Sequence, residues 1–193
     1  MELFDAIKGR RSIRRFTAAP VDDKKVEAIL EAGRWAPSWK NTQCWRFIVV
    51  HDDDIKAKLA DTLIGPVRDN VRGKNGAADA IRQAPVVIVA CAELGKTGLN
   101  AGDFATDKGD WYMFDVALAM QNIVLAAHAL GLGTVHVGLL DAKKAAEVLG
   151  VPPGFCVVEM TPLGYPDPAF EVKAPPRKPL NEIAFKDRWG QTT

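Results

Sequence analysis

The sequence predicts a domain that mixes buried β-strands with α-helices, and three observations carry this prediction. The chain has 193 residues, an ordinary length for one domain. The apolar runs at residues 47–50 and 85–91 are short and rich in valine and isoleucine, as fully buried strands are. The apolar stretch at residues 111–132 is longer, but four polar residues interrupt it, Asp115 among them. It therefore predicts a buried core helix rather than a membrane span.

Hydrophobic periodicity and turn residues predict the elements of the first half. Residues 2–8 indicate an amphipathic helix with Leu3, Phe4 and Ile7 on one face. Asp22 or Asp23 can cap a second helix that ends near residue 35. Further along we expect a loop at 36–45, the strand at 47–50, a helix at 55–63, a loop or mobile flap at 65–76, the strand at 85–91 and a loop at 95–110.

The second half begins with the long core helix, which ends at the GLG of residues 131–133 because glycine can take the left-handed cap. We expect a third strand at 134–137, a helix at 141–149 and a fourth strand at 155–161. After Gly164 the chain is rich in proline through Pro179 and has no periodic pattern. The sequence contains no internal repeat.

The composition is close to neutral and typical of a globular protein. Basic residues number 25 and acidic residues 24, so nothing global attracts nucleic acid or an anionic membrane. The opening MELFDAIKGRR is charged where a signal peptide needs an apolar core, so export is not expected. Cys44, Cys91 and Cys156 have no metal-ligand spacing, and the last two lie in apolar runs. We therefore expect no metal site and a reduced, cytoplasmic protein.

The usual glycine-rich phosphate loops are absent from the sequence. Neither GxGxxG nor GxxxxGK[ST] occurs, which argues against a Rossmann dinucleotide domain and against a P-loop NTPase. If a nucleotide-like cofactor binds, side chains must hold its phosphate.

The first candidate site is a dense cluster of basic residues, Arg10, Arg11, Ser12, Arg14 and Arg15. Guanidinium groups beside a hydroxyl can make bidentate bonds to phosphate oxygens, each worth about 1.5–3 kcal/mol. A solvated basic turn is the alternative. A nucleic-acid patch is less favoured, since only one aromatic residue accompanies the cluster.

The second candidate is the motif P-S-x-x-N-x-Q-x-W, which precedes the first buried strand. Its residues are Pro37, Ser38, Asn41, Gln43 and Trp45. Serine, asparagine and glutamine offer donors and acceptors suited to the edge of a planar heteroaromatic ring. Ordinary turn hydrogen bonding would explain the same residues.

Two weaker features follow. In GTVHVG the strand ends on Gly138, where backbone can approach a flat ligand because no side chain obstructs it. His136 has no cysteine or second histidine nearby, so we interpret it as a satisfied core histidine. Arg177 and Lys178 stand between prolines in APPRKPL, where they could bind an anion or form a solvated tail.

Taken together and in this order, the four features resemble the nitroreductase family of flavoproteins. The resemblance extends over nearly the whole chain, from FDAIKGRRSIRRF through EAGRWAPSWKNTQCWRFIVV, QAPVVIVAC and QNIVLAAHALGLGT to RKPLNEIAF. The combination of RRSIRRF, APSxxNxQxW and AAHALGLGT is highly specific, whereas no single piece would suffice.

The resemblance implies an α+β fold with a mostly antiparallel central sheet flanked by helices. Residues 1–193 would form a single FMN-binding domain. Two copies would intertwine as a homodimer with FMN at the interface, and residues 165–193 would form a C-terminal arm that packs on the partner subunit.

The resemblance also assigns the site. From one subunit, FMN would contact Arg10, Arg11, Ser12 and Arg14. From the other, Pro37, Ser38 and Trp39 would approach it, and Asn41 and Gln43 of the same loop would also bind the cofactor. Val137 and Gly138 match the segment whose backbone faces flavin N5. Arg177 matches a basic residue that reaches the phosphate.

The implied activity is electron transfer from NAD(P)H through FMN to an electron-poor acceptor such as a nitroaromatic or a quinone, with both substrates using one site in turn. The flavin supplies the chemistry and the protein positions and tunes it. Arg14, near the flavin N1/O2 edge, would stabilise the reduced, negatively charged ring. No acid, base or nucleophile of the protein is required.

Alternatives remain within the family and outside it. Flavin reduction, reductive dehalogenation and azoline oxidation would differ mainly in the loops at 65–76 and 95–110. Outside the family, a non-catalytic nucleic-acid-binding domain could use the cluster Arg10–Arg15.

The chain departs from the family pattern at three positions. Cys44 stands where the family usually has proline, and His136 where it often has an aromatic residue. Pro175 stands where a basic residue is expected. These departures leave the FMN expectation in place. They do not indicate the acceptor, nor NADH against NADPH.

Overall fold

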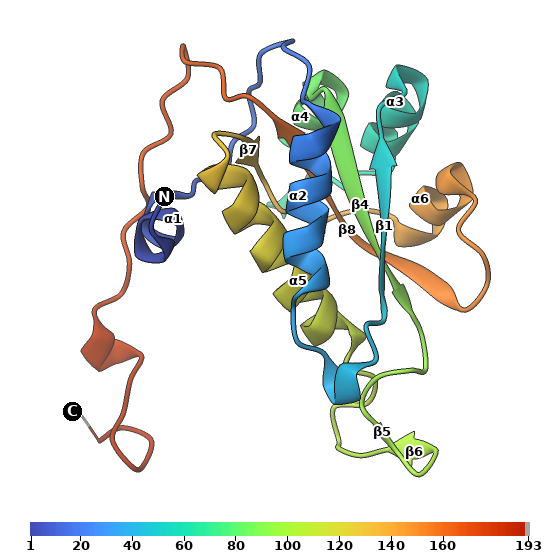
Figure 1. The fold of residues 1–193 in the computed structure, drawn as a ribbon, viewed down its shortest axis with the longest axis vertical. Helices are drawn as coiled ribbons and strands as arrows, with labels where there is room; N and C mark the ends of the chain where they lie inside the picture. The colour runs from blue at the N-terminus through green and yellow to red at the C-terminus, as the bar shows by residue number, and fades with distance from the viewer. Residues whose placement is uncertain (192–193) are drawn as a thin grey trace.

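A four-stranded antiparallel sheet forms the centre of the computed structural model, which describes residues 1–191 and, of Arg68, the backbone only (Figure 1). The strand order is β1-β4-β8-β7, and each neighbouring pair is antiparallel. The strands are β1 (Trp45–Val50), β4 (Val86–Glu93), β8 (Phe155–Gly164) and β7 (Gly133–Thr134). The predicted α+β fold with a mostly antiparallel sheet is confirmed.

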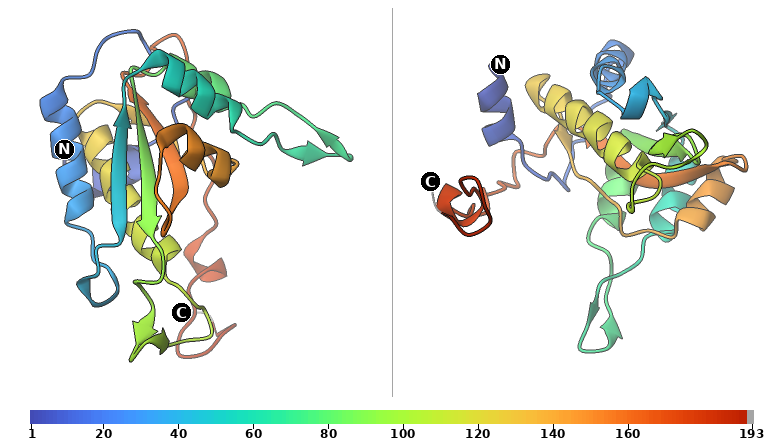
Figure 2. Two further views of the ribbon diagram at one scale, coloured as in Figure 1. Left: turned by 90° about the vertical axis from the view of Figure 1, so that its right-hand side faces the viewer. Right: turned by 90° about the horizontal axis from the view of Figure 1, so that it is seen from below.

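Helices cover both faces of this sheet. On one face lie α2 (Asp23–Arg34) and α5 (Tyr112–Ala129), which pack on each other; on the other lie α3 (Asp53–Asp61), α4 (Ala78–Gln83) and α6 (Ala142–Leu149) (Figures 1 and 2). The side chains of β4 alternate between two cores, as the period of two requires. Because both faces are covered, β4 is buried along nearly its whole length, which explains its continuous apolar run.

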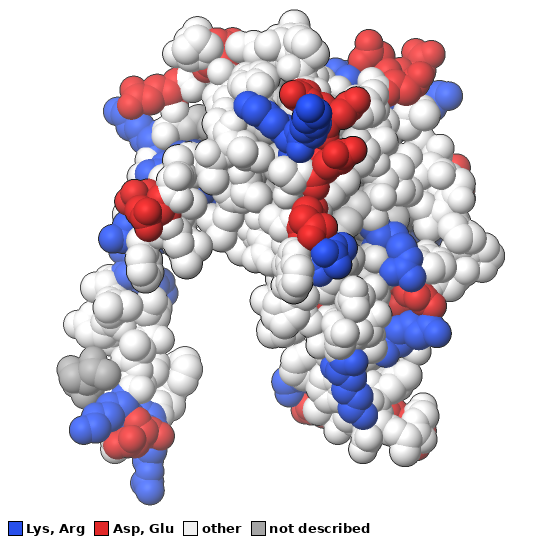
Figure 3. All heavy atoms as spheres, viewed as in Figure 1, with Lys and Arg blue, Asp and Glu red and all other residues white. Residues whose placement is uncertain are grey.

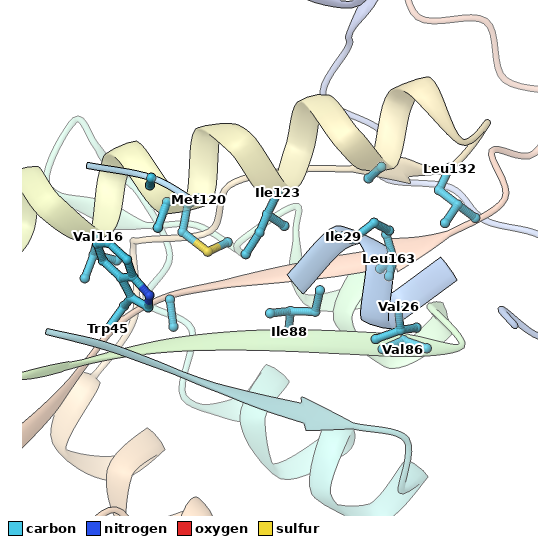
Figure 4. Close-up of a cluster of buried hydrophobic side chains, with 14 of the residues drawn as sticks. Val26, Ile29, Trp45, Val86, Ile88, Val116, Met120, Ile123, Leu132 and Leu163 are labelled. Carbon is cyan, nitrogen blue, oxygen red and sulfur yellow. The ribbon is translucent and has the colours of Figure 1, made fainter. Parts of the chain in front are cut away.

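The core between α2, α5 and the sheet is built from apolar side chains of both helices and three strands (Figure 4). Ile29 of α2, Ile123 of α5 and Ile88 of β4 are completely buried. The core contacts extend along much of α5, which confirms the predicted buried helix at residues 111–132 and explains its low polarity.

Aspartate residues begin three of the helices. The side chains of Asp22, Asp52 and Asp141 accept hydrogen bonds from backbone N–H groups in the first turns of α2, α3 and α6. Such caps satisfy donors that have no partner within the helix. Gly150 ends α6 with a φ of 64°, in the left-handed region that glycine tolerates.

The structure differs from the sequence predictions in three places. The short helix α4 was not expected, since six residues with no capping side chain carry little periodic signal. The loops at 65–76 and 95–110 contain small hairpins, β2 (Val67–Arg68) with β3 (Val71–Arg72) and β5 (Leu99–Asn100) with β6 (Asp103–Phe104). The strand expected at 134–137 is only the two residues of β7, after which Val137 makes an isolated bridge to Met160.

The N-terminal helix contacts α5 at the side of this body, whereas the C-terminal arm extends away from it (Figure 1). The helix α1 (Leu3–Gly9) buries only Ala6, and its apolar residues Leu3, Phe4 and Ile7 are exposed. After Tyr165 and Asp167, which bond to the backbone of residues 15–17, the chain forms an extended arm with one short 3-10 turn, η2 (Leu180–Glu182). Figure 3 shows open space between this arm and the body. Of the predicted arm at 165–193, the last two residues lie outside the described part.

Candidate functional site

The basic cluster lies at the β7 edge of the sheet. We call residues 10–14 the cationic segment. Its Ile13 N–H donates to the Thr134 carbonyl at 2.8 Å, and Ser12 bridges Thr134 in parallel. This approach depends on Gly133, where an added Cβ would come within 2.8 Å of Ile13. The glycines of GLGT therefore end α5 and also let the cationic segment lie against the sheet.

The charge of the cationic segment is not neutralised by acids. Arg11 donates to the carbonyls of Lys8 at 2.7 Å and Arg10 at 2.8 Å, and Arg14 to that of Ser12 at 3.4 Å. Among the described residues, none of these three arginines forms a salt bridge. Burial lowers the pKa of the neighbouring His128, and the Arg10 and Arg11 charges lower it further. The segment is therefore suited to bind an anion.

A hollow of about 280 Å³, which we call the ring hollow, opens beside Arg14. Its lining comes from the cationic segment, both ends of the 65–76 loop and the chain after β7: Arg14, Pro66, Asn75, Gly76, Ala77, Val135, His136, Val137, Gly138 and Leu139. The structure thus brings Arg14, Val137 and Gly138 together, as the sequence interpretation required.

Gly138 presents bare backbone to open space. An added Cβ would meet no protein atom within 4 Å, and the residue does not have a positive φ that would demand glycine. The Val137 N–H is already bonded to the Met160 carbonyl at 3.0 Å, whereas the Gly138 N–H has no acceptor among the described residues. Of the two backbone donors expected to face a flavin, only that of Gly138 is free.

His136 is not the core histidine that we expected from the sequence. Its side chain is 39% exposed and lines the ring hollow, and Nδ1 lies 2.9 and 3.1 Å from the two carboxylate oxygens of Glu159. The strand alternation explains this, because Val135 and Val137 point inward and are 3% exposed. Nδ1 of His136 therefore has a hydrogen-bond partner, as expected, but the side chain lies at the candidate site rather than in the core.

Asn75 is a lining residue that the sequence analysis missed. Its amide donates to the carbonyls of Ile64 at 2.9 Å and Leu139 at 3.2 Å, and its oxygen accepts from the Ala77 N–H at 2.9 Å. These bonds tie the end of the 65–76 loop to the chain after β7. The Asn75–Gly76 pair is a turn signal, but it carries no indication of a pocket.

The second group of predicted residues lies at the other end of α5, in residues 37–43, which we call the Trp39 loop. Ser38 Oγ accepts from the Gln43 N–H at 2.9 Å, and the Asn41 and Gln43 side chains bond each other at 3.2 Å. Positive φ values at Asn41 (57°) and Gln43 (47°) give the loop its sharp shape. Turn hydrogen bonding, the alternative explanation, therefore accounts for much of this motif.

The buried carboxylate of Asp115, which is 1% exposed, holds the Trp39 loop in place. It accepts from the Trp39 N–H at 3.1 Å, from Thr97 Oγ at 2.6 Å and from the Cys44 thiol at 3.9 Å. Burial, with the Asp115 charge second, raises the pKa of Cys44 to about 11, so the thiol keeps its proton. An acid inside an apolar helix was the signal for this role, and the sequence analysis noted it only as an interruption.

Aromatic rings surround the outer side of this loop. Trp39 and Trp111 lie 5.5 Å apart between ring centroids, and Trp111 and Phe114 lie 5.3 Å apart. With Pro37 and Leu118 they line a hollow of about 460 Å³, the aromatic hollow. The Trp39 indole N–H donates to the Leu99 carbonyl at 3.1 Å, which joins the loop at 95–110 to the hollow.

The cationic segment and the Trp39 loop are far apart within one chain. The first packs near His128 and the second near Asp115, thirteen residues earlier on α5, which corresponds to about 20 Å along a helix. Arg177 lies on the exposed arm, and among the described residues its side chain has no hydrogen bond or salt bridge. One copy of the chain does not assemble all the predicted residues into one site.

Two further findings concern ions and membranes. Within residues 1–191, no three histidine, cysteine, aspartate or glutamate side chains gather closely enough to hold a metal ion. No described helix has both the length and the apolarity to cross a bilayer.

Comparison with known proteins places these features in context. The sequence model of the nitroreductase family matches residues 7–165. The NADPH-flavin oxidoreductase of Vibrio harveyi is 28% identical over 190 residues, covering 96% of this chain and 73% of that protein. A nitroreductase family protein of Clostridium novyi superposes with a TM-score of 0.75 at 33% identity, covering 100% and 97% of the two chains. For an FMN-dependent nitroreductase of Clostridium difficile the values are 0.75 and 27%, with 96% and 99% covered.

Proposed function

This chain belongs to the nitroreductase family, and from that premise we propose that it is an FMN-dependent NAD(P)H oxidoreductase. Its relatives include the NADPH-flavin oxidoreductase of Vibrio harveyi and the FMN-dependent nitroreductase of Clostridium difficile. One observation of the structure carries the proposal: an un-neutralised cationic segment lies next to a hollow in which Gly138 offers bare backbone.

The residues of the ring hollow fit a flavin mononucleotide. The open space at Gly138 would accommodate a flat ring, and the free Gly138 N–H is a donor for a ring nitrogen. Arg10, Arg11 and Ser12 would hold the single phosphate, since guanidinium and hydroxyl groups match phosphate oxygens. Arg14, which lines the hollow itself, would lie at the ring.

Bound FMN supplies hydride acceptance and electron transfer. The chain contributes position and charge. The Arg14 cation would favour a negatively charged ring, and the Gly138 N–H would orient the ring by donating to one of its nitrogen atoms. The electron-poor acceptor, such as a nitroaromatic or a quinone, would enter after the oxidised nicotinamide leaves.

A homodimer would complete the site. The Trp39 loop is too far from the cationic segment of its own chain, so we assign Pro37, Ser38 and Trp39 to the FMN held by the partner subunit. Apolar side chains at the periphery also lack cover: Leu3 and Phe4 on α1, Phe114 on α5, and Leu180, Ile183 and Trp189 on the arm are 55–91% exposed. A twofold arrangement would bury the apolar residues of the arm and those of α1 and α5 at once, because the arm of each chain would pack on the other chain.

Three finer assignments belong to the same proposal. Residues 1–193 act as one FMN-binding domain, Arg177 reaches the phosphate when the arm is docked, and Asn41 and Gln43 bind the cofactor from the Trp39 loop. The protein works in the cytoplasm, where its three free cysteines stay reduced.

Cofactor identification tests the function most directly. Released cofactor should chromatograph as FMN, and the FMN-loaded protein should oxidise NADH or NADPH in the presence of nitroaromatics or quinones with ping-pong kinetics. An FAD peak would contradict the single-phosphate assignment. A colourless protein that retains oligonucleotides would favour the nucleic-acid alternative, although acidic and basic side chains are interspersed on the face in Figure 3.

A matched pair of variants localises the ring. Gly138→Val adds a branched side chain to the ring hollow and should weaken FMN binding at least tenfold. Ala28→Val is the matched control, because it adds a branched side chain at an exposed position of α2 outside the ring hollow, and it should leave FMN affinity unchanged. Unchanged affinity in Gly138→Val would place the flavin elsewhere.

A further inference from the structure

His136 is the other titratable residue of the ring hollow, and the function proposed above gives it no role. The charged or titratable side chains that line the hollow are Arg14 and His136. Glu159 does not line the hollow; it contacts His136 from β8 and is 15% exposed. The imidazole therefore bonds to a carboxylate through Nδ1 and also lines the hollow.

The contact with Glu159 distinguishes the two ring nitrogens of His136. Nδ1 is engaged by both Glu159 oxygens, at 2.9 and 3.1 Å, so Nδ1 carries a proton and donates. Nε2 has no partner among the described residues, and it is the nitrogen that gains or loses a proton. A mobile surface histidine would not have this fixed tautomer.

We propose that His136, positioned by Glu159, is a proton-uptake site of the flavin pocket that becomes an imidazolium when bound FMN is reduced. The inference rests on the proposed function, because it requires the flavin in the ring hollow. In this role His136 and Glu159 compensate the negative charge of the reduced ring by taking up a proton, which the backbone and Arg14 do not do.

The charge balance is simple. A hydride from NAD(P)H brings two electrons and one proton, so the ring gains one negative charge. That charge favours the protonated form of a nearby imidazole. One proton from water then goes to His136 Nε2, and the same proton returns to water when the acceptor reoxidises the flavin.

Two other charges act on this equilibrium. Glu159, from β8, favours the imidazolium, and Arg14, from the cationic segment, opposes it. Reduction supplies the negative charge that offsets Arg14. Proton uptake should therefore occur in a pH window where His136 is neutral beside the oxidised ring and protonated beside the reduced one.

The test is the pH dependence of the two-electron reduction potential of the FMN-loaded protein, from about pH 5 to about pH 9, across the range in which histidine titrates. One additional proton per two electrons steepens the slope by about 30 mV per pH unit, since a tenfold change corresponds to that value for a two-electron couple. His136→Gln should lose this steeper region. Glu159→Gln should keep it but move it to lower pH, because the imidazolium loses its counter-charge.

Two controls make the result decisive. His51→Gln, an exposed histidine after β1, should reproduce the unmodified slope. His136→Phe keeps a planar side chain in case the glutamine variant binds FMN poorly. A pH-indicator dye in weak buffer should register fewer protons taken up per flavin reduced in both His136 variants than in the unmodified protein.

The two levels of the proposal fail differently. If the unmodified protein binds FMN but its slope and proton count match those of the His136 variants at every pH, the role of His136 is overturned and the oxidoreductase function stands. If the unmodified protein binds no FMN, the proposed function fails and this inference with it.

Discussion

The two ends of α5 carry the two halves of the candidate site, and they use polar groups in opposite ways. At the C-terminal end, the arginines of the cationic segment form no salt bridge among the described residues, and the Gly138 N–H has no acceptor there. At the N-terminal end, the Asp115 carboxylate and the polar groups of the Trp39 loop bond to each other and to the loop at 95–110. Polar groups left open indicate ligand binding, whereas polar groups that satisfy one another indicate a shape that must be held.

The comparison also bears on assembly. The Trp39 loop is held in a defined shape but does not reach the ring hollow of its own chain. It could contribute to a flavin site only if it contacted the ring hollow of a second copy. The aromatic hollow and the exposed apolar residues of α1 and the arm would then be two parts of one interface. Each half of the site can be perturbed separately.

Deleting residues 165–193 should remove the dimer and with it the flavin, because the arm and its apolar residues would no longer cover the partner. Size-exclusion chromatography with light scattering and the flavin absorbance of the truncated chain measure both effects. A truncated chain that stays folded, monomeric and yellow would show that one copy suffices.

Asp115→Ala should destabilise the Trp39-loop half by about 3 kcal/mol, since hydrogen bonds to a charged group contribute about 1.5–3 kcal/mol each and the donors would stay buried. Urea unfolding measures the loss. Asp110→Ala is the matched control, because that carboxylate bonds to the Gly95 and Tyr112 N–H groups at a more exposed site and should cost less. Equal losses would mean that Asp115 has no special part in holding the loop.

Arg10→Ala and Arg14→Ala should separate holding from tuning. Arg10→Ala should weaken FMN binding by about 1.5–3 kcal/mol, one lost charge-assisted contact, with a near-normal potential. Arg14→Ala should weaken FMN binding less than Arg10→Ala does. It should shift the two-electron reduction potential of the flavin to more negative values by a few tens of millivolts, where about 30 mV corresponds to 1.4 kcal/mol. A binding isotherm and a potentiometric titration of each variant measure these effects. Equal affinity losses with equal potentials would mean that both arginines hold phosphate.

His128 should make the protein without FMN less stable in acid. Burial, Arg10 and Arg11 lower its pKa in the folded state, so below the ordinary histidine pKa of about 6.5 the unfolded chain binds a proton that the folded chain does not. The free energy of unfolding should therefore fall as pH drops below that value, and His128→Gln should flatten the fall. Denaturant unfolding over this pH range, with His51→Gln beside it, decides whether the effect is specific.

Much of the fold could be predicted from local signals. The apolar run of β4, the long core helix and the aspartate caps of α2 and α6 follow from periodicity and from hydrogen bonding within a few residues. The hairpins at 67–72 and 99–104 and the helix α4 could not be predicted, because each is too short to show periodicity; the turn before α4 also depends on contacts distant in sequence. The Asn75 side chain, for example, is held by the carbonyl of Leu139.

By itself, the sequence determined which residues could bind an anion and a flat ring: four guanidinium groups within residues 10–15, and a strand that ends on Gly138. Only the tertiary structure decided that the Gly138 N–H is free while that of Val137 is taken, that His136 turns outward onto Glu159, and that Asp115 holds the Trp39 loop. The chemical groups that a residue carries are given by its own identity in the sequence. Satisfaction of a polar group depends on partners brought together by the sheet and by α5, and those partners stand up to 76 positions away in the chain.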